Sequence, residues 1–324
     1  MKHFESFLAP KLDAFFAYRK DLGYSLKTLR YQLFVLDRYL KEKNADWKDL
    51  QPGFFLEMRS NLPNEARSAN RILTTTRKFF QFLIRQDCLT ENPLKDIPVL
   101  KENTVIPFVF SPEQTEQLLE ATFKRIRQTR GWFLNDFALY MVVLLLVRCG
   151  MRISEPLRLR KDHYRRNDCT LYIERTKFNK DRLIPIPKDV VTQIENYLSV
   201  RKSLLQYDYS PFLLVRTDQK PPTDWQVRKL FHKAMKEIGL GQSRRVIGNV
   251  NFSQPTPHSL RHSFAVNTLL RIKERKGSLQ YALPVLATYM GHSLYWYTAI
   301  YLRVVDAISR KNLVDFTLWQ ERMP

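Results

Sequence analysis

The chain has 324 residues, of which 44% are hydrophobic and 26% are charged, a composition that excludes an intrinsically disordered protein. Its length is sufficient for about two domains with cores of their own. The 53 Lys and Arg against 32 Asp and Glu leave a net charge of +21, which indicates a nucleic-acid partner because so large an excess repels itself in a compact fold. Charge by itself separates neither DNA from RNA nor an enzyme from a passive binder.

Secretion, membrane insertion and a cysteine-based framework are not expected. Cys88, Cys149 and Cys169 share no Cys-x-x-Cys spacing, so we expect reduced thiols and neither disulfides nor a zinc site. The N-terminal segment MKHFESFLAP lacks the apolar core of a signal peptide. The longest apolar run, 138–147, has about half the length that a bilayer requires, which predicts a buried core helix. These features predict a cytoplasmic protein.

Residues 1–95 are predicted to form a helical domain. Gly23 suits the end of one helix and Ser25 the N-cap of the next, whose apolar stripe consists of Leu29, Leu33, Leu36 and Leu40. A later helix is expected within 65–88, with an apolar face opposite a basic face that holds Arg67, Arg71, Arg77 and Lys78. This basic face is either a solvated surface or a helix lying along DNA phosphates, and the sequence does not decide between the two.

Residues 96–110 are predicted to be an interdomain linker, because prolines interrupt any helix there. The domain that follows, 111–324, begins at Ser111 with an N-cap, a proline and a capping-box glutamine. Two β-rich runs, 170–175 and 182–186, flank a short polar segment and predict a β-hairpin. The fold class is therefore mainly α with a small β-sheet, the second domain being α+β.

The first segment with chemical potential surrounds Arg152. Gly150 suits the end of the apolar helix and Ser154 the cap of a following one, so Arg152 is expected in a tight connection. A guanidinium held there is a rigid bidentate ligand for phosphate. The alternative is that Arg152 only caps helix carbonyls or pairs with Glu155.

The second segment is the predicted hairpin, with Lys177 near its tip and Lys180 as a competing residue. A lysine at a hairpin tip is usually just exposed. It becomes chemically relevant only if the tip reaches a leaving group that needs a proton.

The third segment is the start of a helix at Thr256 and Pro257. His258 and Arg261 are expected on one face of its first turn, whereas His262 is expected to point elsewhere. Free N–H groups and the helix dipole favour an anion at this end of a helix. The pair is moderately specific for a phosphate site, since a lone histidine is more often structural.

The fourth segment is Gly291-His292-Ser293, and Tyr301 lies nine positions after His292. The chain has 15 tyrosines, so the presence of one proves little. Tyr295 and Tyr297 lie nearby and are interpreted as packing or base-stacking residues.

In this order, the four segments resemble the catalytic domain of the tyrosine recombinase (phage integrase) family, over roughly half of the chain. The matching boxes are R-I-S-E at Arg152, T-K-F-N-K-D-R with its lysine at Lys177, P-H-S-L-R-H-S-F-A at 257–265, and G-H-S followed by Tyr301. The resemblance implies a two-domain clamp around duplex DNA, with a SAM-like core-binding domain over 1–95 and the catalytic domain over 111–324.

The sequence departs from the family pattern in two places. Cys149 and Met151 replace the more usual threonine and leucine, which we expect to affect packing only. The stretch 269–290 is long and basic, and we interpret it as an insertion with a loop of undefined geometry. The run LPVLATYMGH at 283–292 is similar to members carried by mobile elements.

The resemblance implies site-specific cutting and rejoining of DNA without a metal or other cofactor, through a covalent 3′-phosphotyrosine. The implied catalytic residues are Arg152, Lys177, His258, Arg261, His292 and Tyr301. The two arginines and the two histidines would stabilise charge on the nonbridging phosphate oxygens, and the lysine would protonate the departing 5′-oxygen. Tyr301 would attack, and we expect two arginines and a histidine nearby to favour its deprotonation.

The implied partners are double-stranded DNA and further recombinase subunits, in a homo-tetramer on paired sites, alone or with related recombinases. The apolar C-terminal segment 308–319 either packs on its own core or docks on a neighbouring subunit, and we favour docking. The alternatives are a type IB topoisomerase, a catalytically silent DNA-binding accessory protein and a basic RNA-binding protein. The sequence specifies neither the target site nor the choice among integration, excision, resolution and transposition.

Overall fold

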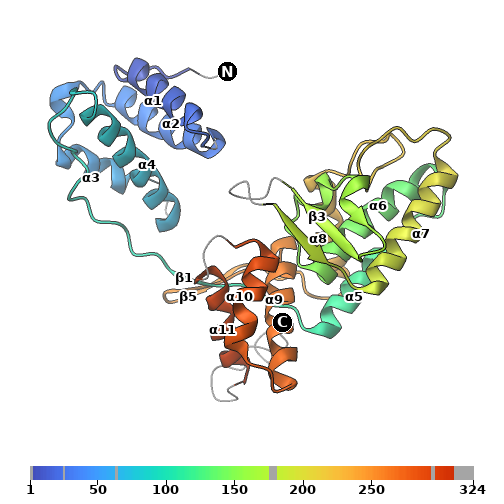
Figure 1. Ribbon diagram of the computed structural model, residues 1–324. Coiled ribbons are helices and arrows are strands. Elements are labelled where there is room, and N and C mark those ends of the chain that lie inside the picture. The colour runs from blue at the N-terminus through green and yellow to red at the C-terminus, as the bar shows by residue number, and fades with distance from the viewer. Residues whose placement is uncertain (1–2, 25, 63–64, 175–180, 293–295, 310–324) are drawn as a thin grey trace. The chain divides into compact units, whose positions relative to one another are not determined.

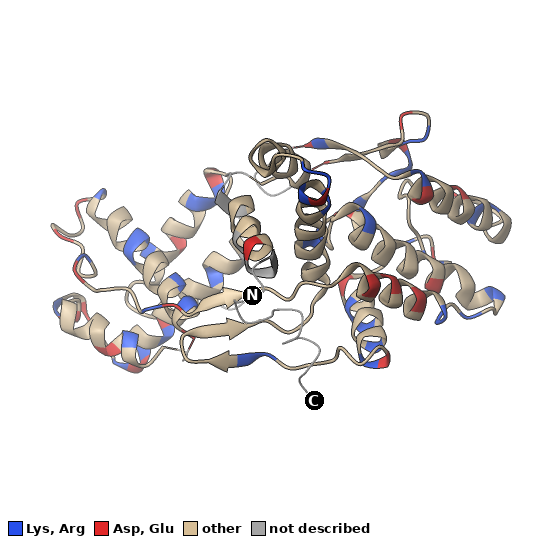
Figure 2. Ribbon diagram, turned by 90° about the horizontal axis from the view of Figure 1, so that it is seen from below, with Lys and Arg blue, Asp and Glu red and all other residues tan. Residues whose placement is uncertain are grey.

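The protein was analysed as a computed structural model that describes residues 3–24, 26–62, 65–174, 181–292 and 296–309. The chain divides into two compact units, 1–104 and 105–324, and each is described by itself (Figure 1). Lys and Arg are spread along helices and loops of both units (Figure 2). All three cysteines are free thiols.

The described residues of the first unit form four α-helices and a short 3-10 turn. They are α1 (Ala9–Asp21), α2 (Leu26–Glu42), η1 (Trp47–Asp49), α3 (Pro52–Ser60) and α4 (Ala66–Ile84). The predicted leucine stripe of α2 faces the core, since Leu33, Leu36 and Leu40 are buried and Leu29 packs against them. Gly23 follows α1 with a φ of 75°, a conformation that favours glycine.

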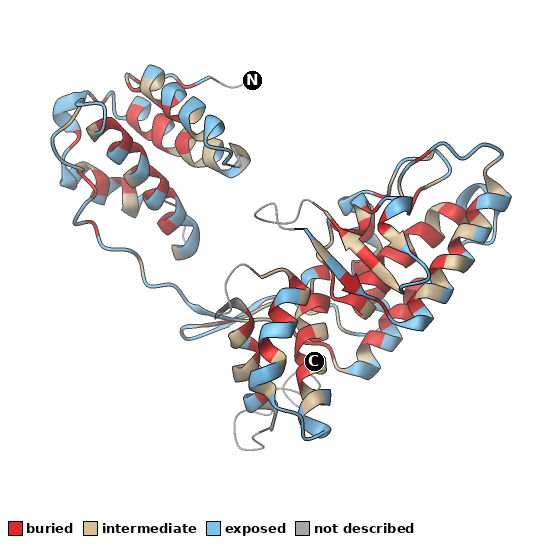
Figure 3. Cartoon of the chain, viewed as in Figure 1, coloured by how far each residue is buried: buried red, intermediate tan, exposed pale blue. Residues whose placement is uncertain are grey.

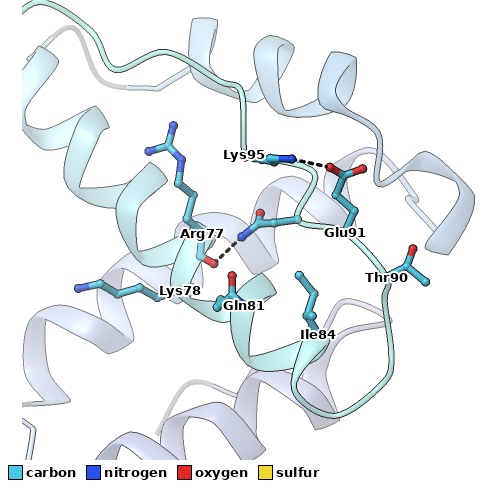
Figure 4. A pocket seen from close by; sticks show the side chains of 8 residues that line it. Arg77, Lys78, Gln81, Ile84, Thr90, Glu91 and Lys95 are labelled. Carbon is cyan, nitrogen blue, oxygen red and sulfur yellow. Dashed lines mark hydrogen bonds and ion pairs between the residues drawn. The ribbon is translucent and has the colours of Figure 1, made fainter.

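The basic face of α4 is partly used inside its own unit. Arg77 donates from Nε to the carbonyl of Leu94 at 2.9 Å and from its terminal nitrogen to the carbonyl of Ile97. Nε of Arg67 lies 3.9 Å from Oε2 of Glu102. Figure 4 shows the hollow of about 870 Å³ between α4 and the segment after it, where Asn92 binds the Arg77 carbonyl. Arg77 is therefore bound within its own unit, whereas Arg71 and Lys78 of the same face are exposed, and a DNA contact by this face stays a prediction.

The segment predicted as a linker is packed at both ends. Ile97 is buried in the first core, and Leu100 exchanges two 2.8 Å hydrogen bonds with the Asn70 side chain. At the other end, the backbone N–H of Phe110 donates to Ser263 Oγ at 2.7 Å. The boundary between the units falls at 104/105, inside the predicted range 96–110, but little of that range is free of either unit.

The core of the second unit forms around α6 (Arg130–Cys149). Within 138–147 every residue except Leu139 is buried, so the predicted core helix is confirmed (Figure 3). By length and composition alone α6 suffices to cross a membrane, yet 67% of its most apolar window is buried, as in the core of a globular domain. Around it pack α5 (Pro112–Phe123), α7 (Lys188–Leu204), α8 (Asp224–Glu237) and α9 (Pro257–Glu274). The predicted capping box at Ser111 is present, with Gln114 N–H at 3.2 Å from its Oγ.

Two small sheets complete the part of this unit that the structure describes, where the sequence predicted one hairpin. The predicted hairpin pairs β3 (Thr170–Ile173) with β4 (Arg182–Pro185), in a register that sets Ile173 opposite Arg182. The prediction missed β2 (Tyr164–Arg165), which follows η3 (Lys161–His163) and pairs with β3. It also missed a second sheet of β1 (Thr104–Ile106), β6 (Val250–Phe252) and β5 (Arg245–Ile247). Strands this short carry too few residues for a visible alternation of apolar and polar side chains.

The last three helices pack on one another, and α9 also packs on α6. They are α9, α10 (Leu279–Met290) and α11 (Trp296–Ser309), coloured orange to red in Figure 1. The stretch 269–290, interpreted as an inserted loop, is the end of α9, a short turn and α10. The expectation of a loop was wrong, because the basic residues lie on and just after the exposed end of α9, while Leu283, Leu286 and Met290 fill the core between the helices. That the stretch is an insertion stays a prediction.

Candidate active site

Arg152 lies in the tight turn that ends α6. Gly150 caps this helix at φ 56°, and a Cβ there would meet Phe264 Cδ1 at 2.4 Å, so the position requires glycine. The chain continues in a single 3-10 turn, η2 (Pro156–Arg158), whose N-cap is Glu155 and not the predicted Ser154. Arg152 donates to Glu155 at 3.0 Å and to the carbonyl of Gly291 at 2.9 Å. The turn after α6 is thereby joined to the segment that precedes α11.

Glu155 is buried beneath Arg152 and binds a second arginine that the sequence analysis overlooked. Arg182, the first residue of β4, reaches both Glu155 oxygens at 3.1 and 2.9 Å and donates to the Tyr289 carbonyl at 2.8 Å. Burial alone would raise the pKa of the Glu155 carboxyl, but Arg182, the Arg152 N–H and the charge of Arg261 hold it below its ordinary value. The carboxylate therefore fixes two arginines from distant parts of the chain.

Glu155→Gln is expected to lower the free energy of unfolding at neutral pH by about 3–5 kcal/mol, because it removes one charge of a buried ionic cluster. Since the folded pKa of Glu155 lies below the ordinary 4.5, its contribution is complete above pH 4.5 and is lost as the pH falls through the folded value. Urea unfolding of both proteins from pH 7 to pH 3 measures the difference. A gap that does not narrow in acid would contradict this role.

The first turns of α9 carry the histidine–arginine pair. Pro257 is the first helical residue and the Thr256 N–H donates to Ser259 Oγ at 3.0 Å. Arg261 is 1% exposed, and its guanidinium donates to the Gly150 carbonyl at 2.8 Å and to the Met290 carbonyl. His258 is exposed at the same end of the helix. This arrangement holds Arg261 between the ends of α6 and α10.

The structure corrects the expectation for His262. Its ring lies 4.6 Å from that of His258, one helical turn away, and its Nδ1 lies 2.9 Å from the hydroxyl of Tyr301. Residues four apart lie on one helix face, a signal in the sequence that the analysis did not use. His262 thus belongs to the same cluster as the predicted residues.

His292 and Tyr301 come from the last helical pair. His292 follows α10, and its Nδ1 lies 2.7 Å from the hydroxyl of the buried Thr298, which no sequence motif indicated. Tyr301 lies on α11, is 2% exposed, and has its ring centre 6.4 Å from that of His292. Segments around residues 150, 260, 291 and 301 therefore meet in one place.

Burial and the charges of the cluster together keep its histidines neutral. Burial, His258, Arg261 and His292 lower the pKa of His262 to about 3. Burial, Arg261, Arg152 and His258 lower the pKa of His292 to about 4. Partial desolvation of the His258 ring, followed by the charges of Arg261 and Arg152, lowers its pKa as well. At neutral pH each ring carries one N–H and offers one donor.

Tyr301 is a neutral phenol at neutral pH in the free protein. Burial raises the pKa of Tyr301 to about 12, although Arg261 and Arg152 act in the opposite direction. The expectation that nearby cations favour its deprotonation was thus incomplete, because desolvation of a phenolate outweighs them. Burial and the repulsion of Arg152 lower the pKa of Arg261 to about 9, which leaves the guanidinium charged at neutral pH.

Some predicted residues lie outside the described parts of the chain. These are Lys177 and Lys180 between β3 and β4, Tyr295, the side chain of Tyr297, and the segment after residue 309. The base of the Lys177 hairpin is described, and Arg182 joins it to Glu155. Within the described ranges, no group of three or more His, Cys, Asp or Glu side chains has the arrangement of a metal site.

A comparison with known protein families matches residues 109–307, more than half of the chain, to the phage integrase family. Residues 12–87 match the family described as phage integrase, N-terminal SAM-like domain. The chain belongs to the phage integrase family. It is therefore a site-specific recombinase of the tyrosine recombinase type, an enzyme that cuts and rejoins DNA strands.

Relatives of the recombinase match along nearly the whole chain. The tyrosine recombinase XerA of Pyrococcus furiosus is 27% identical over 317 residues, 94% of each chain. The tyrosine recombinase XerD of Staphylococcus haemolyticus is 29% identical over 308 residues, 93% of this chain and 90% of its own.

Solved structures share the fold at lower identity. The XerH site-specific recombinase bound to palindromic difH substrate, in a post-cleavage complex, has a TM-score of 0.65 at 20% identity, covering 89% of this chain and 80% of that one. The lambda integrase (75–356) dimer bound to a COC′ core site has a TM-score of 0.63 at 20% identity, covering 89% and 96%. The predicted fold class, mainly α with small sheets, is confirmed.

Proposed function

We propose that the recombinase cleaves DNA by attack of Tyr301 on the scissile phosphate, forming a 3′-phosphotyrosine. The observation that supports this assignment is the convergence of Tyr301 with Arg152 and Arg261 from three separate segments of the second unit. In the attack a bond forms between phosphorus and the phenolic oxygen, and the bond from phosphorus to the 5′-oxygen breaks. The covalent intermediate conserves the phosphodiester energy, so attack by a 5′-hydroxyl rejoins the strand.

The two arginines are proposed to bind the nonbridging oxygens, where negative charge concentrates in the transition state. His258 and His292 are neutral and donate one N–H each to the same oxygens. If the Thr298 hydroxyl donates to Nδ1 of His292, the ring proton lies on Nε2. Lys177 is proposed to protonate the 5′-oxygen, which is otherwise a poor leaving group, with Lys180 as the competing donor.

Duplex DNA is the proposed substrate, held between a core-binding domain over 1–95 and a catalytic domain over 111–324. The net charge of +21 supports a phosphate-rich partner. Neighbours in fold include a lambda integrase tetramer bound to a Holliday junction, at a TM-score of 0.63. We therefore propose a multimer on paired DNA sites. More specifically, we propose a homo-tetramer in which the C-terminal segment of each subunit docks on a neighbouring subunit. We propose that the protein is cytoplasmic and associated with DNA.

A suicide substrate tests this proposal. The recombinase is incubated without magnesium with duplexes nicked near candidate exchange points, drawn from DNA that flanks its gene, and denaturing gels reveal covalent protein–DNA adducts. An adduct supports the proposal. DNA binding without an adduct on any candidate would favour the accessory-protein alternative, and relaxation of a plasmid that lacks such sites would favour a topoisomerase.

A further inference from the structure

We propose that His262 is the group that holds the Tyr301 hydroxyl and accepts its proton during attack. The imidazole Nδ1 lies 2.9 Å from the phenolic oxygen, within ordinary hydrogen-bond distance. This inference rests on Tyr301 being the nucleophile, as proposed above. Because His262 touches the reacting atom itself, it would be a catalytic residue.

Packing fixes the relation of the two side chains. His262 lies on α9 and Tyr301 on α11, two helices in direct contact, and their ring centres are 5.7 Å apart. Tyr301 is 2% exposed, so its hydroxyl has little access to water. Among the described residues, His262 is the hydrogen-bonding neighbour found for this hydroxyl.

The need of a buried hydroxyl for an acceptor selects the tautomer. If Nδ1 of His262 carried the ring hydrogen, it would donate to Tyr301 and leave the phenolic hydrogen without an acceptor in a buried place, at a cost of about 1–3 kcal/mol. With the ring hydrogen on Nε2, Nδ1 accepts the phenolic hydrogen. That tautomer already has the geometry for proton transfer.

Burial, together with the charges around His262, keeps the proton on Tyr301 while no DNA is bound. His258 and Arg261 face His262 from α9, His292 from the segment after α10, and Tyr301 from α11. Burial and then these neighbours lower the pKa of His262 to about 3, and burial raises the pKa of Tyr301 to about 12, so the proton stays on the phenol in the free protein. A bound phosphate anion offsets the positive charge of the arginines and raises the pKa of His262, because an opposite charge favours the protonated ring.

The proton balance of the step is complete. As the phosphorus–oxygen bond to Tyr301 forms, the phenolic O–H bond breaks and an N–H bond forms at Nδ1 of His262. The bond from phosphorus to the 5′-oxygen breaks, and that oxygen takes a proton from a different donor, Lys177 in the proposed function. In rejoining, the 5′-hydroxyl gives its proton back to Lys177 and attacks phosphorus. The bond from phosphorus to the Tyr301 oxygen breaks, and the imidazolium returns its proton to the departing phenolate.

His262→Asn is the main test, since the asparagine side-chain oxygen can accept a hydrogen bond near the position of Nδ1 but cannot retain the proton. Adduct formation is followed in a single turnover on the suicide duplex at saturating protein, from pH 5 to pH 9. We expect the wild-type rate to rise with pH through one ionisation, and the variant to be slower by about 10²–10³-fold and to lack that ionisation. An unchanged profile and a rate within about threefold of wild type would overturn the proposal.

Two further substrates and variants separate proton acceptance from other roles. A duplex with sulfur in place of the 5′-bridging oxygen has a good leaving group, so it should rescue Lys177→Ala but not His262→Asn. Added imidazole should partly restore His262→Ala by occupying the space left by the ring. Rescue of His262→Asn by the sulfur substrate would overturn the proposal, since it would place His262 on the leaving group.

Two controls keep the inference distinct from the proposed function. In the same assay Tyr301→Phe tests the nucleophile alone, so an adduct that survives this change refutes the proposed function whatever His262 does. Nitrogen-15 NMR of the histidine side chains is done on the wild-type protein, so it does not depend on whether a variant folds. An Nε2–H tautomer for His262 supports the proposal, and an Nδ1–H tautomer overturns it.

Discussion

Tyr301→Phe is expected to abolish the covalent protein–DNA adduct, by at least about 10⁴-fold, because the change removes the attacking oxygen and with it the intermediate. The rest of the phenyl ring stays, and Tyr301 is packed against α9 and α10 in a core that the substitution preserves. Binding to duplex DNA should therefore remain near the wild-type value. The measurement is the suicide-substrate gel in the absence of magnesium, with filter binding alongside it.

The same variant should also be less stable than the wild type by about 1–3 kcal/mol, since it leaves the buried Nδ1 of His262 without its hydrogen-bond partner. Tyr289→Phe is the matched control within the described part of the second unit, because its hydroxyl has only a 3.4 Å contact to the Pro185 carbonyl. It should keep the adduct, as should Tyr295→Phe and Tyr297→Phe. An adduct lost from one of these and retained in Tyr301→Phe would move the nucleophile.

Arg152→Ala is expected to slow adduct formation by about 10²–10³-fold, the usual effect of removing one donor to charge that develops in a transition state. Arg152→Lys should also lose most of this rate, because an ammonium cannot replace the two-pronged contact of a guanidinium with phosphate. The Arg152 side chain is 22% exposed, so the loss should occur with a modest change in stability. Single-turnover rates at saturating protein measure the effect.

Arg182→Ala provides the matched comparison, since Arg182 binds the same carboxylate but its side chain is only 8% exposed. It should lower the free energy of unfolding by about 3 kcal/mol, because Glu155 loses a partner with which it is buried. The cleavage rate of the molecules that remain folded should fall less than in Arg152→Ala. An equal loss of rate in a fully folded Arg182→Ala protein would mean that Arg182 also contacts the phosphate.

Much of the secondary structure of this recombinase, and its family, could be predicted from local sequence. The leucine stripe of α2, the apolar run of α6 and the capping box at Ser111 specify helices through contacts between residues three or four apart. The four ordered boxes likewise identified the family, because each box is a short segment whose residue types are required by one chemistry. The helical class, the division near residue 100 and the main catalytic candidates follow from patterns of this range.

Only the tertiary structure decided how these segments meet. The contact of His262 with Tyr301 joins residues 39 apart in sequence, and that of Arg152 with Gly291 joins residues 139 apart. Neither periodicity nor a motif predicts contacts between residues so far apart in sequence, because such contacts depend on how α9, α10 and α11 pack together. The burial of Tyr301 also results from this packing, and no residue type encodes it by itself. Desolvation in the packed core raises the pKa of Tyr301 above that of a free phenol, despite two nearby arginines.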